Sequence, residues 1–126
     1  MGLTTRLERN RVRMGETVRL IAKVRNRTHR GQPMTLVRIG LPGGLAFQTW
    51  QLKRLREQGR IAFYETRPRE GILYLQALRP SETRTLPIVL TARVPGTYTA
   101  PASSAYLYYT DEHKTWAAPV RVAIAP

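Results

Sequence analysis

The sequence predicts a mainly β protein, a two-layer antiparallel β-sandwich with one inserted α-helix. Several segments alternate apolar and polar residues with a period of two, which is typical of strands with one buried face. Turn sequences such as "LPGG", "RPREG" and "VPGT" separate these segments. Only residues 49–60 show the period of a helix. Because an apolar sheet face has to be covered, about seven such strands predict two packed sheets.

Residues 1–15 are weakly patterned, and we expect an edge strand or a linker there. The clearest strand is 17–26, and further strands are expected at 34–41, 72–78, 85–94, 103–109 and 118–124. In the segment 85–94 the inward row is unbroken: Leu86, Ile88, Leu90, Ala92 and Val94. Pro87 lies on the opposite face, where it suits an edge strand or a bulge.

The segment "TWQLKRLREQGR" predicts the helix, which should extend from about Phe47 to Gln58. Leu52, Leu55 and Gly59 share one side, so we expect packing through the two leucines and a stop at the glycine. Thr49 is the expected N-cap residue. A neighbouring, solvent-facing stripe carries Thr49, Lys53, Arg56 and Arg60.

The net charge of +13 is concentrated in the first half of the chain. Residues 1–60 hold 14 basic and 3 acidic residues, whereas residues 61–126 hold 7 and 5. The excess fits a surface for nucleic acid, anionic lipid or an acidic protein. It also fits a chain that uses Arg at many solvent-exposed positions without a binding role. The outward, unclustered placement of most arginines favours this second interpretation.

The sequence offers no pattern of a catalytic or metal site. No Ser, His and carboxylate arrangement suggests a nucleophile, and the lack of cysteine excludes thiol catalysis and cysteine-built zinc sites. Asp111, Glu112 and His113 are consecutive, and such residues seldom converge on one ion, so we expect a polar loop there. We therefore predict no enzyme activity, no cofactor and no metal site.

Two other patterns each allow two interpretations. Asn26 begins "NRT", a glycosylation sequon that often occurs by chance. The tyrosines of "AYLYY" suit either stacking on bases or packing on a sheet. Strand alternation places Tyr106 and Tyr108 on one face and Tyr109 on the other, which favours packing.

Several segments follow one another in a specific order: "MTLVRIGLPGGL", a helix with "QLKRL", "GRIAFYET", "ILYLQAL", "PIVLTARV" and "PASSAYLYYTDEH". This order resembles the C-terminal receptor-binding domain of the alpha-2-macroglobulin family. The resemblance covers roughly Thr17 to Trp116. It is most specific at the helix, bracketed by Gly44 and the strand containing Glu65, and at the tyrosine-rich "AYLYY".

The resemblance implies a macroglobulin-type or immunoglobulin-like sandwich and a role in recognition. In vertebrate members this domain becomes exposed after the protein traps a protease, and an endocytic receptor binds two lysines one turn apart on the helix. The second lysine corresponds to Lys53 and the first to Thr49, so half of the pair is missing, while Arg56 and Arg60 extend the stripe. These four residues are the candidate partner-binding residues.

Arg and Lys select different acidic sites. Together with the absent cysteines, the Arg bias suits a bacterial homologue, for which no vertebrate-type receptor is expected. The reactive thioester of the family needs a Cys-Gly-Glu-Gln motif, which we expect in a preceding domain of a longer protein.

We therefore expect residues 1–126 to be a single receptor-binding-type domain from the C-terminal end of a secreted or periplasmic protease trap. Its expected partners are a receptor or neighbouring domains, and a trapped protease through the full-length protein. Alternatives are an electrostatic binder of nucleic acid or anionic polymer, and an unrelated immunoglobulin-like adhesion or scaffold domain. No run approaches the about 20 apolar residues of a membrane span.

Overall fold

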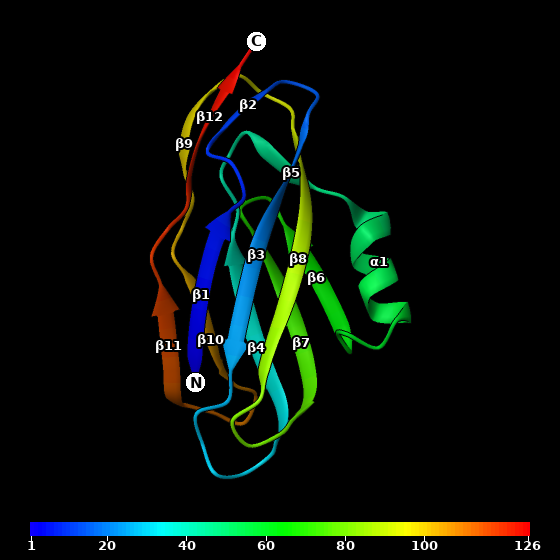
Figure 1. Cartoon of the computed structure of the whole chain (residues 1–126), viewed down its shortest axis with the longest axis vertical. Coiled ribbons are helices and arrows are strands. Elements are labelled where there is room, and N and C mark those ends of the chain that lie inside the picture. The colour runs from blue at the N-terminus through cyan, green and yellow to red at the C-terminus, as the bar shows by residue number, and fades with distance from the viewer.

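A computed structural model describes the backbone of residues 1–126 and the side chains of residues 1–109 and 114–126. This backbone forms strands in three sheets and one helix, α1 (Thr49–Glu57), as Figure 1 shows. The predicted β-sandwich with one inserted helix is confirmed.

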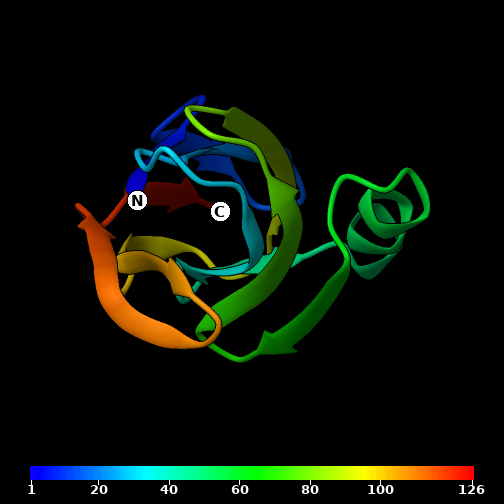
Figure 2. The same cartoon turned by 90° about the horizontal axis from the view of Figure 1, so that it is seen from below.

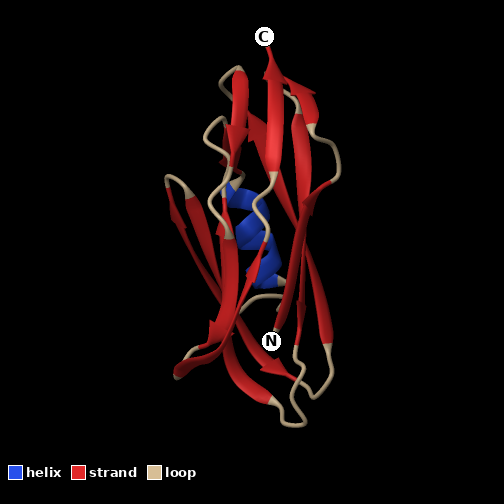
Figure 3. Cartoon of the chain, turned by 90° about the vertical axis from the view of Figure 1, so that its left-hand side faces the viewer, coloured by secondary structure: helices blue, strands red, loops and turns tan.

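Two larger sheets make the two layers of the sandwich (Figure 3). The four-stranded sheet has the order β1 (Gly2–Leu7), β3 (Thr17–Arg25), β8 (Thr83–Ala92), β5 (Leu45–Phe47). The five-stranded sheet has the order β11 (Thr110–Ala117), β10 (Ser103–Leu107), β4 (Gln32–Gly40), β7 (Glu70–Leu78), β6 (Phe63–Arg67). All pairs within these two sheets are antiparallel.

A third, smaller sheet lies at the end of the molecule that holds the C-terminus (Figure 1). Its order is β2 (Arg11–Arg13), β12 (Arg121–Ala125), β9 (Gly96–Thr99). The sequence predicted antiparallel sheets. Strand β12 runs parallel to β2, so this small sheet differs from that prediction.

The core lies between the two larger sheets and follows the period-2 rows of the sequence. Val18, Leu20, Ala22 and Val24 of β3 are fully buried. In β8 the buried row ends at Ala92, because the strand ends there and Val94 is exposed. The prediction of an inward row through Val94 is therefore wrong.

The two sides of the sandwich are closed differently. On one side β1 contacts β10 and β11 of the opposite sheet. On the other side α1 contacts β8 of one sheet and β6 of the other. Figure 2 shows the helix outside the ring of strands, and it therefore covers an edge of the sandwich and not a sheet face.

The remaining differences from prediction occur where strands are short or end early. The short strands β2, β5 and β9 carry too few residues to show an alternating pattern. Strand β10 ends at Leu107, so Tyr108 and Tyr109 lie in a turn and not on opposite strand faces. The segment 111–113, predicted to be a polar loop, falls within the bounds of β11.

Candidate partner-binding surface

Helix α1 is defined more clearly at its C-terminus than at its N-terminus. Gly59 has φ +73°, and its N–H donates to Arg56 O at 3.0 Å. The N–H of Arg60 donates to Leu55 O at 2.9 Å, which completes a Schellman motif. The predicted glycine stop is therefore confirmed.

The N-terminus of α1 differs from the prediction: the cap lies one residue before the expected Thr49, and the helix begins at Thr49 and not near Phe47. The N-cap is Gln48, in extended conformation and without a side-chain capping hydrogen bond, and Thr49 is the first helical residue. The Gln48 side chain instead donates to Thr91 Oγ1 of β8. The Gln48 side chain therefore bonds to the sheet and does not cap the helix.

The inner side of α1 packs through Leu52 and Leu55, which are almost fully buried, as predicted. A third inner residue, Gln51, is polar and only 7% exposed. Its Nε2 donates to Pro87 O at 2.7 Å, and its Oε1 accepts from Val89 N–H at 3.2 Å. The amide of Gln51 therefore binds the backbone of β8 as a neighbouring strand would.

These contacts explain the position of Pro87. In an antiparallel ladder the N–H and C=O of one residue point to the same side. The carbonyl of Pro87 points towards α1, so its nitrogen also lies on the edge away from β3, where no ladder bond is lost. Arg60 adds a third contact on this edge, because its Nη2 donates to Thr85 O at 2.6 Å.

The four predicted binding residues are all exposed, but they do not all lie on the helix. Thr49, Lys53 and Arg56 lie within α1, whereas Arg60 follows the Schellman turn and is tied to β8. The prediction that Arg60 continues the helical stripe is therefore wrong in its geometry. Arg60 lies beside the helix because it bonds to β8, and not because it continues the helical period.

Exposed aromatic rings accompany two arginines of α1. The guanidinium of Arg54 lies 5.7 Å from the ring centroid of Trp50, and that of Arg56 lies 5.1 Å from the ring of Phe63 in β6. Such contacts hold a guanidinium in place while its N–H groups stay free for a carboxylate. The sequence patterns did not predict a role for Trp50, Arg54 or Phe63; an i, i+4 Trp–Arg pair was the available signal for the first two.

The cations of the helix are not neutralised within the described part of the chain. Ion pairs there join Arg9 to Glu16, Arg38 and Arg67 to Glu70, Arg67 to Glu65, and Arg84 to Glu82. None of these pairs includes a residue of the segment 49–60. Arg54 and Arg56 in the last turn also complement the helix dipole, which gives them a structural role as well.

Other candidate sites offer less. Among the described side chains, no group of three His or carboxylate residues is placed to hold a metal ion. The predictions for the side chains of Asp111, Glu112 and His113 lie outside the described residues. In the described chain no helix is long and apolar enough to span a membrane.

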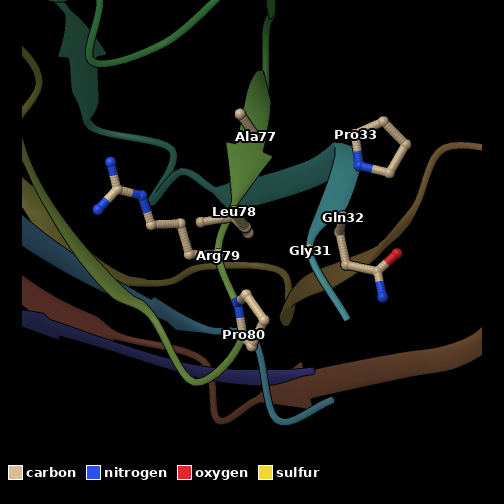
Figure 4. A pocket seen from close by; sticks show the side chains of 7 residues that line it. All are labelled: Gly31, Gln32, Pro33, Ala77, Leu78, Arg79 and Pro80. Carbon is tan, nitrogen blue, oxygen red and sulfur yellow. The ribbon is translucent and has the colours of Figure 1, made fainter. Parts of the chain in front are cut away.

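An open, mostly apolar depression of about 360 Å³ lies at the ends of β4 and β7 (Figure 4). It is lined by Gly31, Gln32, Pro33, Ala77, Leu78, Arg79 and Pro80. It holds no nucleophile or carboxylate that would suit a reaction.

Asn26, the residue of the sequon, is completely buried beside this end of the sandwich. Its Nδ2 donates to the carbonyls of Arg30, Leu78 and Arg79, and its Oδ1 accepts from Thr28. The amide is fully used in joining two loops, so it is not an accessible glycosylation site.

Comparison with known proteins places this surface in a family context. The A-macroglobulin receptor binding domain family matches residues 30–118. A mutant alpha-2-macroglobulin from Salmonella is 20% identical, with a TM-score of 0.76 over 98% of this chain and 9% of that one. A C-terminal fragment of native alpha-2-macroglobulin from Escherichia coli is 18% identical, with a TM-score of 0.78 over 99% of this chain and 23% of that one.

A CARDB domain from Pyrococcus furiosus, in complex with di-metal ions, is 17% identical, with a TM-score of 0.58 over 98% of this chain and 93% of that one. No curated protein sequence matches this chain. At these identities the likenesses to solved structures establish the fold, and the chain spans less than a quarter of the alpha-2-macroglobulin chains. Because the family match from residue 30 to residue 118 takes in well over half of the 126 residues, this protein belongs to the A-macroglobulin receptor-binding domain family.

Proposed function

We propose that this chain is a non-catalytic protein-interaction module of an alpha-2-macroglobulin-like protease trap, and that its partner binds the basic helix α1. The observation that carries the proposal is a set of exposed cations on a helix whose inner side packs against the sandwich. Gln51 binds the backbone of β8, and Leu52 and Leu55 belong to the core cluster, while Lys53 and Arg56 are exposed. A preorganised surface loses less entropy on binding, which favours recognition.

The proposed contact residues are Thr49, Lys53, Arg56 and Arg60. Lys53 offers a compact ammonium, and Arg56 offers a guanidinium positioned by Phe63. Arg60 uses one of its N–H groups on Thr85 O, and a guanidinium has four more. The chemistry of these groups calls for a partner with carboxylates at fixed spacing.

Within a longer trap protein, the partner is a receptor or a neighbouring domain, and the trapped protease is bound by the full-length protein. We propose that residues 1–126 act there as a single domain and that the protein works outside the cytoplasm, either secreted or in the periplasm. The family match and the likeness to bacterial alpha-2-macroglobulins support this placement.

Electrostatic binding of nucleic acid or another anionic polymer is the second candidate, and the net charge of +13 is its support. Exposed arginines occur on β2, β3 and β12 as well as beside α1, and are therefore spread over several elements of the fold. We expect only weak association with nucleic acid, indifferent to sequence and strongly weakened by salt.

A site-specific cross-link tests the proposal. A photoreactive residue at Glu57, exposed on the same helix, should capture one partner from the secreted or periplasmic proteins of the source organism. The same residue at Thr4, exposed on β1, is the matched control. The adduct from position 57 should disappear when Lys53→Ser and Arg56→Ser are combined; an adduct that persists, or that also forms from position 4, contradicts the proposal.

A further inference from the structure

The solvent-facing side of the five-stranded sheet carries a row of apolar side chains in direct register. Tyr106 of β10 pairs with Leu36 of β4, Leu36 pairs with Tyr74 of β7, and Tyr74 pairs with Phe63 of β6. Paired residues point to the same face, so these four lie in one line across the sheet. Trp116 of β11 lies on the same face, because its partner Ser104 is two residues from Tyr106. We call Phe63, Tyr74, Leu36, Tyr106 and Trp116 the aromatic row.

Burial shows that this row faces outward from the core. Leu36 and Ile72 are buried, yet neither belongs to the core cluster between the sheets. Ile72 alternates with Tyr74 along β7 and therefore shares its face. Since both side chains point away from the core, the neighbouring rings on this face must cover them. Trp116 remains 61% exposed and Phe63 44% exposed, so the aromatic row is only partly covered by the chain itself.

A cation lies at each end of the aromatic row. At the β6 end the guanidinium of Arg56 lies over Phe63, whose ring centroid is also 5.8 Å from that of Tyr74. At the β11 end the ammonium of Lys114 lies 5.1 Å from the Tyr106 ring and 4.6 Å from the Trp116 ring. Both cations are held by aromatic faces.

The polar groups beside the aromatic row are largely matched with one another. Glu70 forms ion pairs with both Arg38 and Arg67, and Arg67 Nη2 also lies 3.8 Å from Glu65 Oε2. The hydroxyl of Tyr74 donates to Glu65 at 3.3 Å. Burial, together with the charge of Glu65, raises the pKa of Tyr74. This network leaves an aromatic centre with a matched polar border, which is the composition of a protein-protein interface.

We propose that the outer face of the five-stranded sheet is a second docking surface, which adjoins the outer side of helix α1 and shares Arg56 with it, for an acidic protein surface with an apolar centre. The apolar centre covers the aromatic row, and carboxylates of the partner meet Arg56 and Lys114 at its two ends. Electrostatic complementarity favours such a partner, because the whole chain carries +13. A second copy of this chain fits poorly, since in either orientation the ends of its row would bring cations against cations.

Two synthetic peptides serve as probes for this surface in the 126-residue chain. In one, glutamates alternate with leucines; in the other, the leucines are replaced by serines. Amide chemical shifts of isotope-labelled protein are followed during titration with each peptide. We expect the leucine peptide to perturb β10, β4, β7 and β6 and to bind at least about tenfold more tightly than the serine peptide. Equal binding of both peptides, or shifts confined to α1, overturns the proposal.

Variants locate the contact. Phe63→Ser combined with Trp116→Ser should weaken binding of the leucine peptide about tenfold, because truncated aromatic anchors are the usual hot spots. Trp50→Ser, a matched change of an exposed ring on α1, should leave it unchanged. Lys114→Glu should weaken binding, and Lys23→Glu on β3, with the same change in net charge, should do so much less.

The melting temperature of each variant checks that the fold is kept. Sedimentation velocity of the free chain covers the second-copy alternative: a dimer that dissociates on the Phe63 and Trp116 substitutions would overturn the proposal. Lys53→Ser should leave the affinity for the leucine peptide unchanged. A negative result for this surface can therefore be told apart from a negative result for partner binding by the helix.

Discussion

The side-chain amide of Gln51 hydrogen-bonds to the backbone of Pro87, with Nε2 donating to the carbonyl oxygen at 2.7 Å, and thereby takes the place of a strand beside β8. Strand β5 covers only the last part of β8, from Leu90 to Ala92. Gln51 and Arg60 bind three backbone groups of the edge that β5 leaves open: Pro87 O, Val89 N–H and Thr85 O. A packing function therefore explains why a small β protein carries one helix: an edge that is covered does not pair with other chains.

Replacement of Gln51 should destabilise the fold. Gln51→Leu keeps the size of the side chain but leaves Pro87 O and Val89 N–H without their partner in a nearly buried place. We expect the free energy of unfolding to fall by about 2 kcal/mol. Urea denaturation measures it, and Gln58→Leu, at an exposed position of the same turn, is the control. A loss as small as that of the control would contradict the strand-like role of Gln51.

Leu55 anchors the same helix through apolar packing. It is 3% exposed and belongs to the core cluster. Leu55→Ala should lower the free energy of unfolding by about 2–4 kcal/mol, because a buried leucine leaves a cavity. Thermal and urea unfolding both report this change. A loss of only a few tenths of a kcal/mol would mean that the helix is not held by its leucines.

Asn26 should tolerate neither charge nor glycosylation. In Asn26→Asp a carboxylate oxygen replaces the Nδ2 that donates to Arg30 O at 2.7 Å and to Arg79 O at 3.0 Å. Because oxygen would face oxygen in a buried site, we expect a loss of about 3 kcal/mol or more at neutral pH. Asn10→Asp, at an exposed position, should cost far less. Equal stability of the two variants would contradict a stabilising role for the hydrogen bonds of Asn26.

Glu82 should give the stability a specific dependence on pH. Its Oε1 accepts from the Arg79 N–H at 2.9 Å and its Oε2 from Arg84 Nη2 at 2.9 Å. The backbone N–H of Arg79, followed by Arg84, lowers the pKa of Glu82. A carboxyl with a lowered pKa in the folded state stabilises the fold above its unfolded pKa, and this contribution is lost as the pH falls through the folded value.

Glu82→Gln tests this linkage. The variant should be less stable than the original protein at neutral pH, and the difference should shrink below about pH 4, where an unperturbed glutamate becomes protonated. Urea denaturation across this range measures the difference. If the difference stays constant or grows in acid, the carboxylate of Glu82 does not contribute in this way.

The main strands and the helix were predictable because their burial is periodic. The rows Val18 to Val24 and Leu86 to Ala92 point inward in the structure, and Leu52 and Leu55 form the helix seam. The role of Gly59 was also predictable, because a left-handed backbone at a helix end favours glycine.

The parts that sequence could not predict depend on tertiary contacts. Gln51 is a polar residue on a buried helix side, and its role becomes visible only when the open edge of β8 lies beside it. The helical stripe ended at Arg56 because the Schellman turn redirects the chain before Arg60. The aromatic row combines residues from five strands, whose alignment depends on sheet order and register.

We propose that α1 uses its inner side for packing and its outer cations for recognition. The dissociation constant of the partner captured at Glu57 tests it most directly, measured for the original chain, for Lys53→Ser with Arg56→Ser, and for Lys23→Ser with Arg25→Ser on β3. We predict that the helix variant binds about 10–100-fold more weakly, because two charge-assisted contacts are lost. Its melting temperature should fall only slightly, through the lost dipole and ring contacts of Arg56, and the β3 variant should bind almost normally. Equal affinities for the original chain and the helix variant, or equal losses in the two variants, would contradict the claim.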